Sequence, residues 1–155
     1  MIRAKKSLGQ HFLKDKKTLL AIARHAQTCG LPVLEVGPGR GALTRFLLDA
    51  GLSVVAIEKD HRLIDDLRRT FVDELRQGTL TLIEGDALEI TPESVGYTKG
   101  MFQVVANLPY YITGHYLRQT LESETRPASM TLMLQKEVVD RIVARNEKES
   151  ILSVS

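Results

Sequence analysis

Short β-branched runs alternate with longer amphipathic segments along this chain, and few folds suit such an alternation. The runs are mostly continuous in apolar residues, as in parallel strands that are covered on both faces. They occupy Val33–Val36, Val54–Glu58, Leu80–Glu84, Phe102–Ala106 and Met130–Leu134. This order predicts the α/β class, with an open, doubly wound, mostly parallel sheet and right-handed crossovers.

The segments between the runs carry apolar residues at helical spacing. We expect one helix around Leu19–Ala26 and another around Val138–Val143. A third is expected over Leu63–Leu75, with Asp60 as its N-cap. The 155 residues contain no internal repeat or linker-like stretch, so a single domain is expected.

The composition excludes several other classes of protein. It is 43% hydrophobic and 26% charged, and charged residues interrupt every long apolar run, so no membrane span is expected. The N-terminus lacks the apolar core of a signal peptide, and the single Cys29 cannot form an internal disulfide. We therefore expect a cytoplasmic protein. The four histidines are scattered without metal-ligand spacing, so no metal is expected.

Charge is distributed unevenly along the chain. Residues 1–17 hold six basic side chains against the single acidic Asp15, a net charge of +5, whereas the whole chain carries only +2. A basic arm on a mildly acidic body suggests an anionic macromolecular partner. A solvated polar tail is the alternative that charge alone leaves open.

In sheets of this kind, ligands bind outside the carboxyl ends of the strands. Gly37, Gly39 and Gly41 follow the first strand and precede a helix, so backbone N–H groups can approach a ligand there. The G-x-G-x-G spacing is neither the dinucleotide nor the P-loop pattern, and a tight turn without a ligand is the alternative. Glu58 lies 21 residues beyond Gly37, close to the separation of about 20 at which an acidic residue reaches a ribose diol. Glu58 as a helix cap is the alternative, although Asp60 is better placed for that.

Asp86 stands just past the third strand, next to Gly85. Its carboxylate can accept a hydrogen bond from the exocyclic amine of adenine, although the residue alone fits an Asx-turn or a cap equally well. Together, the first three strand ends provide places for an amino-acid moiety, a ribose and an adenine. That is the outline of S-adenosylmethionine, which we expect as the cofactor.

The fourth strand ends at Asn107-Leu108-Pro109-Tyr110, where a turn alone would need little more than the proline. The chain resembles the rRNA adenine N6-dimethyltransferase family in this motif and, in family order, in Ser7–Leu13, Glu35–Gly41, Glu58–Asp60, Gly85–Ala87, Asn107–Thr113 and Leu132–Val138. The similarity runs from about Lys5 to the last residue. It implies a Rossmann-like class I S-adenosylmethionine-dependent methyltransferase that dimethylates adjacent adenosines in the rRNA of an immature small ribosomal subunit.

The resemblance also implies which residues form the site. The cofactor would be bound by Gln10, His11, Leu13, Gly37, Gly39, Glu58, Asp86, Ala87 and Asn107. The catalytic residues would be Asn107, Leu108, Pro109 and Tyr110. In the arm, Lys5, Lys6, Lys14 and Lys17 would face RNA phosphates and give a salt-dependent affinity.

The chemistry at Asn-Leu-Pro-Tyr follows from the weakness of the adenine N6 amine as a nucleophile, because its lone pair is delocalised into the ring. The Asn107 side-chain oxygen and the Leu108 carbonyl would accept from the two amine hydrogens and direct the lone pair toward the methyl donor. Pro109 has a fixed φ and helps to hold that carbonyl outward. Tyr110 offers a ring face on which an extruded base can stack. Catalysis would then be mostly positioning.

Three alternatives remain beside this reading. A related branch modifies an adenosine in large-subunit rRNA, but Leu108 and the following Tyr111–Thr113 favour the small-subunit branch. A non-catalytic rRNA-binding assembly factor is disfavoured by the intact acceptor motif. A nicotinamide-dependent oxidoreductase is disfavoured by the glycine spacing.

The chain is shorter than the family pattern. We expect residues 1–17 to form the basic arm and residues 18–155 to form a methyltransferase domain that is truncated after the fifth strand. The last two strands of the usual seven-stranded sheet and the small helical domain would be missing, and one sheet edge would be open. We expect a monomer in which cofactor binding survives better than rRNA methylation.

Overall fold

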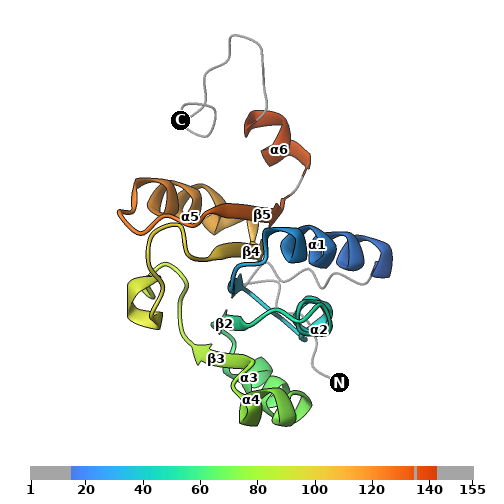
Figure 1. Ribbon diagram of the computed structural model, residues 1–155. Helices are drawn as coiled ribbons and strands as arrows, with labels where there is room; N and C mark the ends of the chain where they lie inside the picture. Colours follow the sequence, from blue (N-terminus) through green and yellow to red (C-terminus); the bar gives the residue numbers. More distant parts are fainter. Residues whose placement is uncertain (1–14, 135, 143–155) are drawn as a thin grey trace.

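The computed structural model describes residues 15–134 and 136–142 (Figure 1). The elements are α1 (Lys16–Cys29), β1 (Val33–Val36), α2 (Ala42–Asp49), β2 (Val54–Glu58), α3 (His61–Thr70), α4 (Val72–Gln77), β3 (Leu80–Glu84), the 3₁₀ turn η2 (Glu93–Val95), β4 (Gln103–Asn107), α5 (Tyr110–Glu122), β5 (Ser129–Met133) and α6 (Lys136–Ile142). The strands and helices alternate as the sequence predicts.

The described strands form one five-stranded sheet in the order β3-β2-β1-β4-β5, with every neighbouring pair parallel. The doubly wound α/β prediction is therefore confirmed, and the strand order reverses between β1 and β4. Three expected strands have the observed bounds. The other two differ by one residue, because β4 begins at Gln103 and β5 at Ser129. In the described sheet, β5 lies at one edge.

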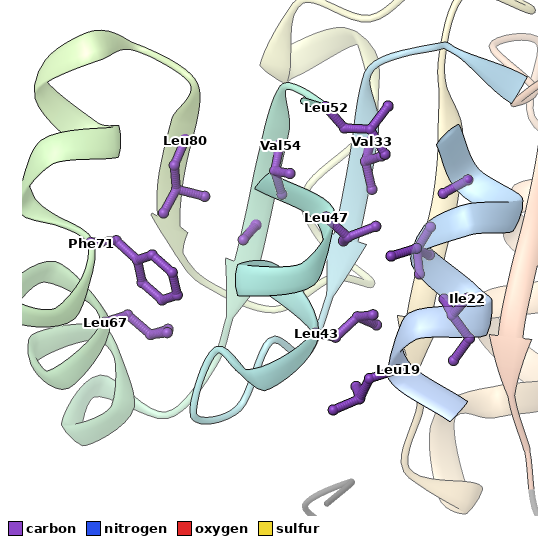
Figure 2. Close-up of a cluster of buried hydrophobic side chains, with 14 residues drawn as sticks. Leu19, Ile22, Val33, Leu43, Leu47, Leu52, Val54, Leu67, Phe71 and Leu80 are labelled. Carbon is purple, nitrogen blue, oxygen red and sulfur yellow. The ribbon is translucent and has the colours of Figure 1, made fainter. Parts of the chain in front are cut away.

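Apolar side chains cover the sheet on both faces. One cluster joins α1, α2, α3 and the strands, and Figure 2 shows Leu43 and Leu47 of α2 between α1 on one side and Leu67 and Phe71 on the other. The second cluster packs α5, through Tyr116, and the β3–β4 connection against the opposite face. Since both faces are covered, the ends of the strands are left as the places where a ligand can bind.

The helix expected over Leu63–Leu75 is divided in two, so that prediction is corrected. Asp60 caps α3 as expected, accepting from the Arg62 N–H at 3.2 Å. The break falls at Phe71, whose φ of −115° and ψ of 37° are not helical. Its ring is buried, and the Arg45 guanidinium lies 4.6 Å from the ring centroid. These contacts tie the chain to the core at Phe71 and give α4 a separate course.

Candidate functional site

Parallel pairing brings the predicted strand ends together at one edge of the sheet. Val36 of β1 is in register with Ile57 of β2 and with Ala106 of β4, so the residues that follow these strands are neighbours. The Gly37 N–H donates to the Ile57 carbonyl at 3.0 Å. A Cβ added to Gly37 would lie 3.5 Å from the backbone oxygen of Asn107. The glycine loop and the Asn-Leu-Pro-Tyr motif, 70 residues apart, therefore meet.

The three glycines of the loop have left-handed backbone conformations, with φ of 71° at Gly37, 61° at Gly39 and 76° at Gly41. Gly41 is the N-cap of α2, and a glycine is needed there because a side chain would collide with the core. A Cβ there would come within 2.8 Å of Leu67 and closer still to the Phe71 ring. Only Gly37 and Gly39 remain as candidates for close approach to a ligand.

The carboxylate of Glu58 is buried and holds the glycine loop against β2. Its Oε2 accepts from the Gly39 N–H at 3.1 Å, and its Oε1 accepts from the Asp60 N–H at 2.9 Å. Burial raises the pKa of Glu58, and these two N–H donors oppose the rise. Each carboxylate oxygen has a second acceptor position, so the group can still receive hydroxyl hydrogens from a ligand.

Asp86 forms the Asx-turn that the sequence left open as an alternative, and it also forms an ion pair that the sequence did not indicate. Its Oδ1 accepts from the Leu88 N–H at 3.0 Å, while its Oδ2 lies 2.5 Å from Nζ of Lys59. The Lys59 ammonium, followed by the Leu88 N–H, lowers the pKa of Asp86. The sequence carries no signal for this pair, because only the register of β2 with β3 brings Lys59 to Asp86. The neighbouring Ala87 is buried and packs into the α5-side cluster.

Glu35 is a second ionisable group that received no role from the sequence. It lies inside β1, only 1% exposed, and accepts from the Thr44 hydroxyl of α2 at 2.7 Å. Burial raises its pKa to about 8, and the Thr44 hydrogen bond opposes that rise. The pair fixes the start of α2 directly behind the glycine loop. A carboxylate in an otherwise apolar strand could have indicated it.

Asn107 is the last residue of β4 and pairs in register with Met133 of β5. The Leu108 side chain is buried in the α5-side cluster, so only the backbone of Leu108 is left for chemistry. Pro109, with φ −60° and ψ 140°, precedes α5 directly. Its carbonyl accepts from the Ile112 N–H and from the Thr113 hydroxyl. The motif is thus a strand-to-helix turn that is anchored from the helix side.

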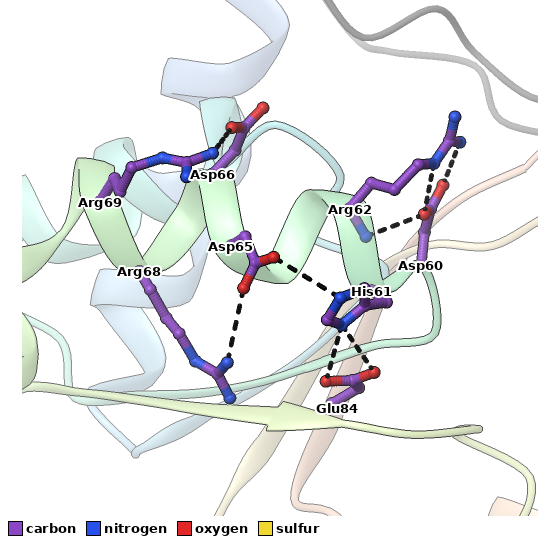
Figure 3. A network of polar contacts seen from close by, with 8 residues as sticks. All are labelled: Asp60, His61, Arg62, Asp65, Asp66, Arg68, Arg69 and Glu84. Carbon is purple, nitrogen blue, oxygen red and sulfur yellow. Dashed lines mark hydrogen bonds and ion pairs between the residues drawn. The ribbon is translucent and has the colours of Figure 1, made fainter.

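Charges on α3 are largely matched among themselves (Figure 3). Arg62 binds Asp60 at 2.6 Å, and His61 lies 3.2 Å from Glu84 of β3. Further along the helix, arginines pair with acidic residues three positions away, Arg68 with Asp65 and Arg69 with Asp66. This helix therefore does not present a row of uncompensated basic groups to an anionic partner.

Several predicted site residues fall outside the described part of the chain. They are Gln10, His11 and Leu13 for the cofactor and Lys5, Lys6 and Lys14 for RNA. The ring of Tyr110 is likewise outside the description, although Tyr110 begins α5. Lys17 is described, and it is exposed in the first turn of α1.

Within residues 15–134 and 136–142, no helix is long and apolar enough to cross a membrane. In the same ranges, no three His, Cys, Asp or Glu side chains are grouped in a way that could hold a metal ion.

Comparison with known proteins places the whole arrangement in one family. Residues 1–155 match the family model described as ribosomal RNA adenine dimethylase. Ribosomal RNA small subunit methyltransferase A of Caulobacter vibrioides is 50% identical over 143 residues, which are 92% of this chain and 54% of that protein. The chain spans about half the length of the curated relatives it matches.

Two solved structures are similar over most of the chain. The 23S rRNA methyltransferase ErmE has a TM-score of 0.73 and 31% identity, over 90% of this chain and 54% of that one. A dimethyladenosine transferase from Plasmodium falciparum has a TM-score of 0.70 and 28% identity, over 91% and 49%. The fold is thus that of a methyltransferase, and the resemblance found in the motifs is confirmed. The chain belongs to the ribosomal RNA adenine dimethylase family.

Proposed function

We propose that the protein transfers methyl groups from S-adenosylmethionine to the N6 amines of adjacent adenosines in small-subunit rRNA. The observation that carries this proposal is the meeting of two motifs at the switch point of the sheet. There, the backbone of Gly37 lies against the Asn107 carbonyl. A donor held by one motif and an amine held by the other would be adjacent, as methyl transfer requires.

Residues 37–41, 58–60 and 86–88 form what we call the cofactor half of the site. We propose that Gly37 and Gly39 let the backbone approach the amino-acid moiety, that Glu58 accepts from the ribose hydroxyls and that Asp86 accepts from the adenine amine. Ala87, Asn107 and, from the arm, Gln10, His11 and Leu13 complete this cofactor contact. The residues fit the group, because the two carboxylates lie at neighbouring strand ends and keep acceptor positions. When bound, S-adenosylmethionine supplies an electrophilic sulfonium methyl group.

Residues 107–110 form the acceptor half. We propose that the Asn107 side-chain oxygen and the Leu108 carbonyl accept from the two hydrogens of the target amine and direct its lone pair. Pro109 fixes the backbone that carries this carbonyl, and the ring of Tyr110 stacks on the extruded base. The support is the observed turn, in which the Leu108 side chain is buried and its backbone remains for the substrate.

Lys5, Lys6, Lys14 and Lys17 are proposed to contact rRNA phosphates, which would make binding salt-dependent. We propose that residues 1–17 act as this arm, that residues 18–155 carry the methyltransferase site, and that the protein works as a cytoplasmic monomer on an immature small subunit. The substrate branch is supported by the 50% identical relative, which is named as a small-subunit methyltransferase. The similarity to ErmE supports the large-subunit branch as the second candidate.

Two measurements test the proposal. Calorimetry should detect binding of S-adenosylmethionine by the folded chain, and a folded sample without binding would contradict the cofactor assignment. Tritiated methyl groups should then appear as N6,N6-dimethyladenosine in small-subunit rRNA from unmethylated ribosomes. Label found only in large-subunit rRNA would establish the second candidate instead.

A further inference from the structure

One side of α5 stays exposed as the helix leaves the acceptor half. It carries Tyr111, His115, Arg118 and Glu122, which recur at intervals of three or four residues and so share one face of the helix. We call these residues the α5 row. The row begins directly after Tyr110 of the acceptor half, and Tyr111 is 49% exposed. The helical rise makes the row from Tyr111 to Arg118 about 10 Å long.

The α5 row lies beside the loop that follows β3. Nε2 of Gln119, next to the row on α5, donates to the Leu88 carbonyl at 3.0 Å and ties this side of the helix to that loop. The pKa of Asp86 is lowered first by Lys59 and, to a smaller extent, by His115 of the row. The row therefore starts where the target base is proposed to bind and continues past the β3 end of the site.

The α5 row differs from the exposed face of α3 in the groups that it presents. On α3, arginines are paired with acidic residues of the same helix, Arg68 with Asp65 at 3.7 Å (Figure 3). The α5 row also has an acidic member, because Arg118 lies 4.0 Å from Glu122, but it adds a phenol ring and an imidazole. Rings on which bases stack and a guanidinium that binds phosphate are the groups that bind a single nucleic-acid strand.

We propose that Tyr111, His115 and Arg118 bind the nucleotides that flank the target adenosine in rRNA. This inference rests on the proposed function, in which the target base is extruded at Tyr110, and it adds a substrate surface to that site. Extrusion of a base removes a stacking partner from its neighbours, so the ring of Tyr111 can replace that stacking for one of them. His115 and Arg118, farther along the helix, donate to the sugar and phosphate oxygens that follow.

The test measures binding of the whole chain to a fluorescein-labelled RNA hairpin whose loop contains two adjacent adenosines, by anisotropy at several salt concentrations. Tyr111→Ala should weaken binding by about 5–150-fold, and Tyr111→Phe, which keeps the ring, should retain most of the affinity. Arg118→Gln should reduce the slope of log affinity against log salt concentration by about 0.7, the contribution of one phosphate of a single strand.

Arg68→Gln is the matched control, since the Arg68 side chain is 53% exposed against 52% for Arg118 and is also paired on its own helix. Equal salt slopes in the two glutamine variants, with wild-type affinity in Tyr111→Ala, would overturn the RNA surface and leave the proposed function intact.

Calorimetry with S-adenosylmethionine separates this surface from the cofactor half. The variants of Tyr111 and Arg118 should bind the cofactor as the wild type does. A loss of cofactor affinity as large as the loss of RNA affinity would overturn the assignment of the α5 row to RNA. A folded wild type that binds neither the hairpin nor S-adenosylmethionine would overturn the proposed function and this surface with it.

Discussion

The two halves of the site are held in place by different forces. The cofactor half is held by hydrogen bonds to acidic side chains. Glu58 accepts from two backbone N–H groups and Asp86 accepts from the Lys59 ammonium, while Glu35, behind the glycine loop, accepts from the Thr44 hydroxyl. In the acceptor half, the anchors are neutral, the Ile112 N–H and the Thr113 hydroxyl on the Pro109 carbonyl. The adjoining β5 is only partly buried along its whole length. We conclude that pH acts on the first half, and that the second depends on backbone geometry.

The largest effect is expected from Glu35. Its pKa is about 8 in the folded protein and 4.5 for an ordinary glutamate. Between pH 4.5 and pH 8, Glu35 is therefore protonated in the folded state and ionised in the unfolded state. Stability should therefore fall as the pH rises through this window, by about 3–5 kcal/mol in total. Glu35→Gln cannot titrate and should remove most of that fall. Urea unfolding at pH 5 and pH 8 measures it, and an equal fall in the variant would contradict the assignment.

Asn107→Ala should lower methyl transfer by about 10²–10³-fold, the usual loss when one group that stabilises a transition state is removed. The variant should still fold, because the Ile112 N–H and the Thr113 hydroxyl continue to anchor the Pro109 carbonyl. Transfer of tritiated methyl groups to unmethylated small subunits measures the rate. Gln77→Ala, at the exposed end of α4, is the control. Turnover near that of the control would exclude Asn107 from catalysis.

Gly41→Ala should destabilise the protein by about 2–4 kcal/mol, because an added Cβ would collide with the Phe71 ring in addition to the cost of a left-handed φ. Gly51→Ala is the matched variant. Its φ is 80°, but nothing lies within 4 Å of an added Cβ, so about 1 kcal/mol is expected. Thermal unfolding of both variants separates packing from backbone strain. Similar losses would show that the Phe71 contact is unimportant.

The smallest difference is expected from two buried hydroxyls. Thr44→Val leaves Glu35 without its donor and should cost about 2 kcal/mol. Thr113→Val removes one of two donors to a backbone carbonyl and should cost about 1 kcal/mol. Denaturant unfolding at pH 8, where more of Glu35 is ionised, should widen the gap. A larger loss for Thr113→Val would mean that the acceptor half has the stronger side-chain anchor.

Much of the fold was available from the sequence, because covered parallel strands leave continuous apolar runs with few alternatives. The strand ends then followed from topology, which brings Gly37, Glu58 and Asn107 to one edge without any knowledge of side-chain contacts. The break at Phe71 could not be predicted, since its apolar spacing fits a continuous helix and only packing against α2 separates the two helices.

Partners of charged groups were also beyond the sequence. From the sequence, the Lys59 ammonium could equally be solvated or paired with a residue at a neighbouring strand end. Only the register of β2 with β3 shows that its partner is Asp86. The partner of Glu35 could not be predicted either. Thr44 lies beyond the glycine loop, on a helix whose rotation about its axis depends on core packing.

The central position of β1 has a consequence for chain length. Val33 of β1 pairs with Val54 of β2, 21 residues later in the sequence, and with Gln103 of β4, 70 residues later. Loop-closure entropy grows only with the logarithm of length, so the longer return costs only about 1 kcal/mol more than the shorter. Loop closure therefore disfavours the distant β4 pairing only slightly, and the packing of the β3–β4 connection against the sheet decides how far that segment can change in length.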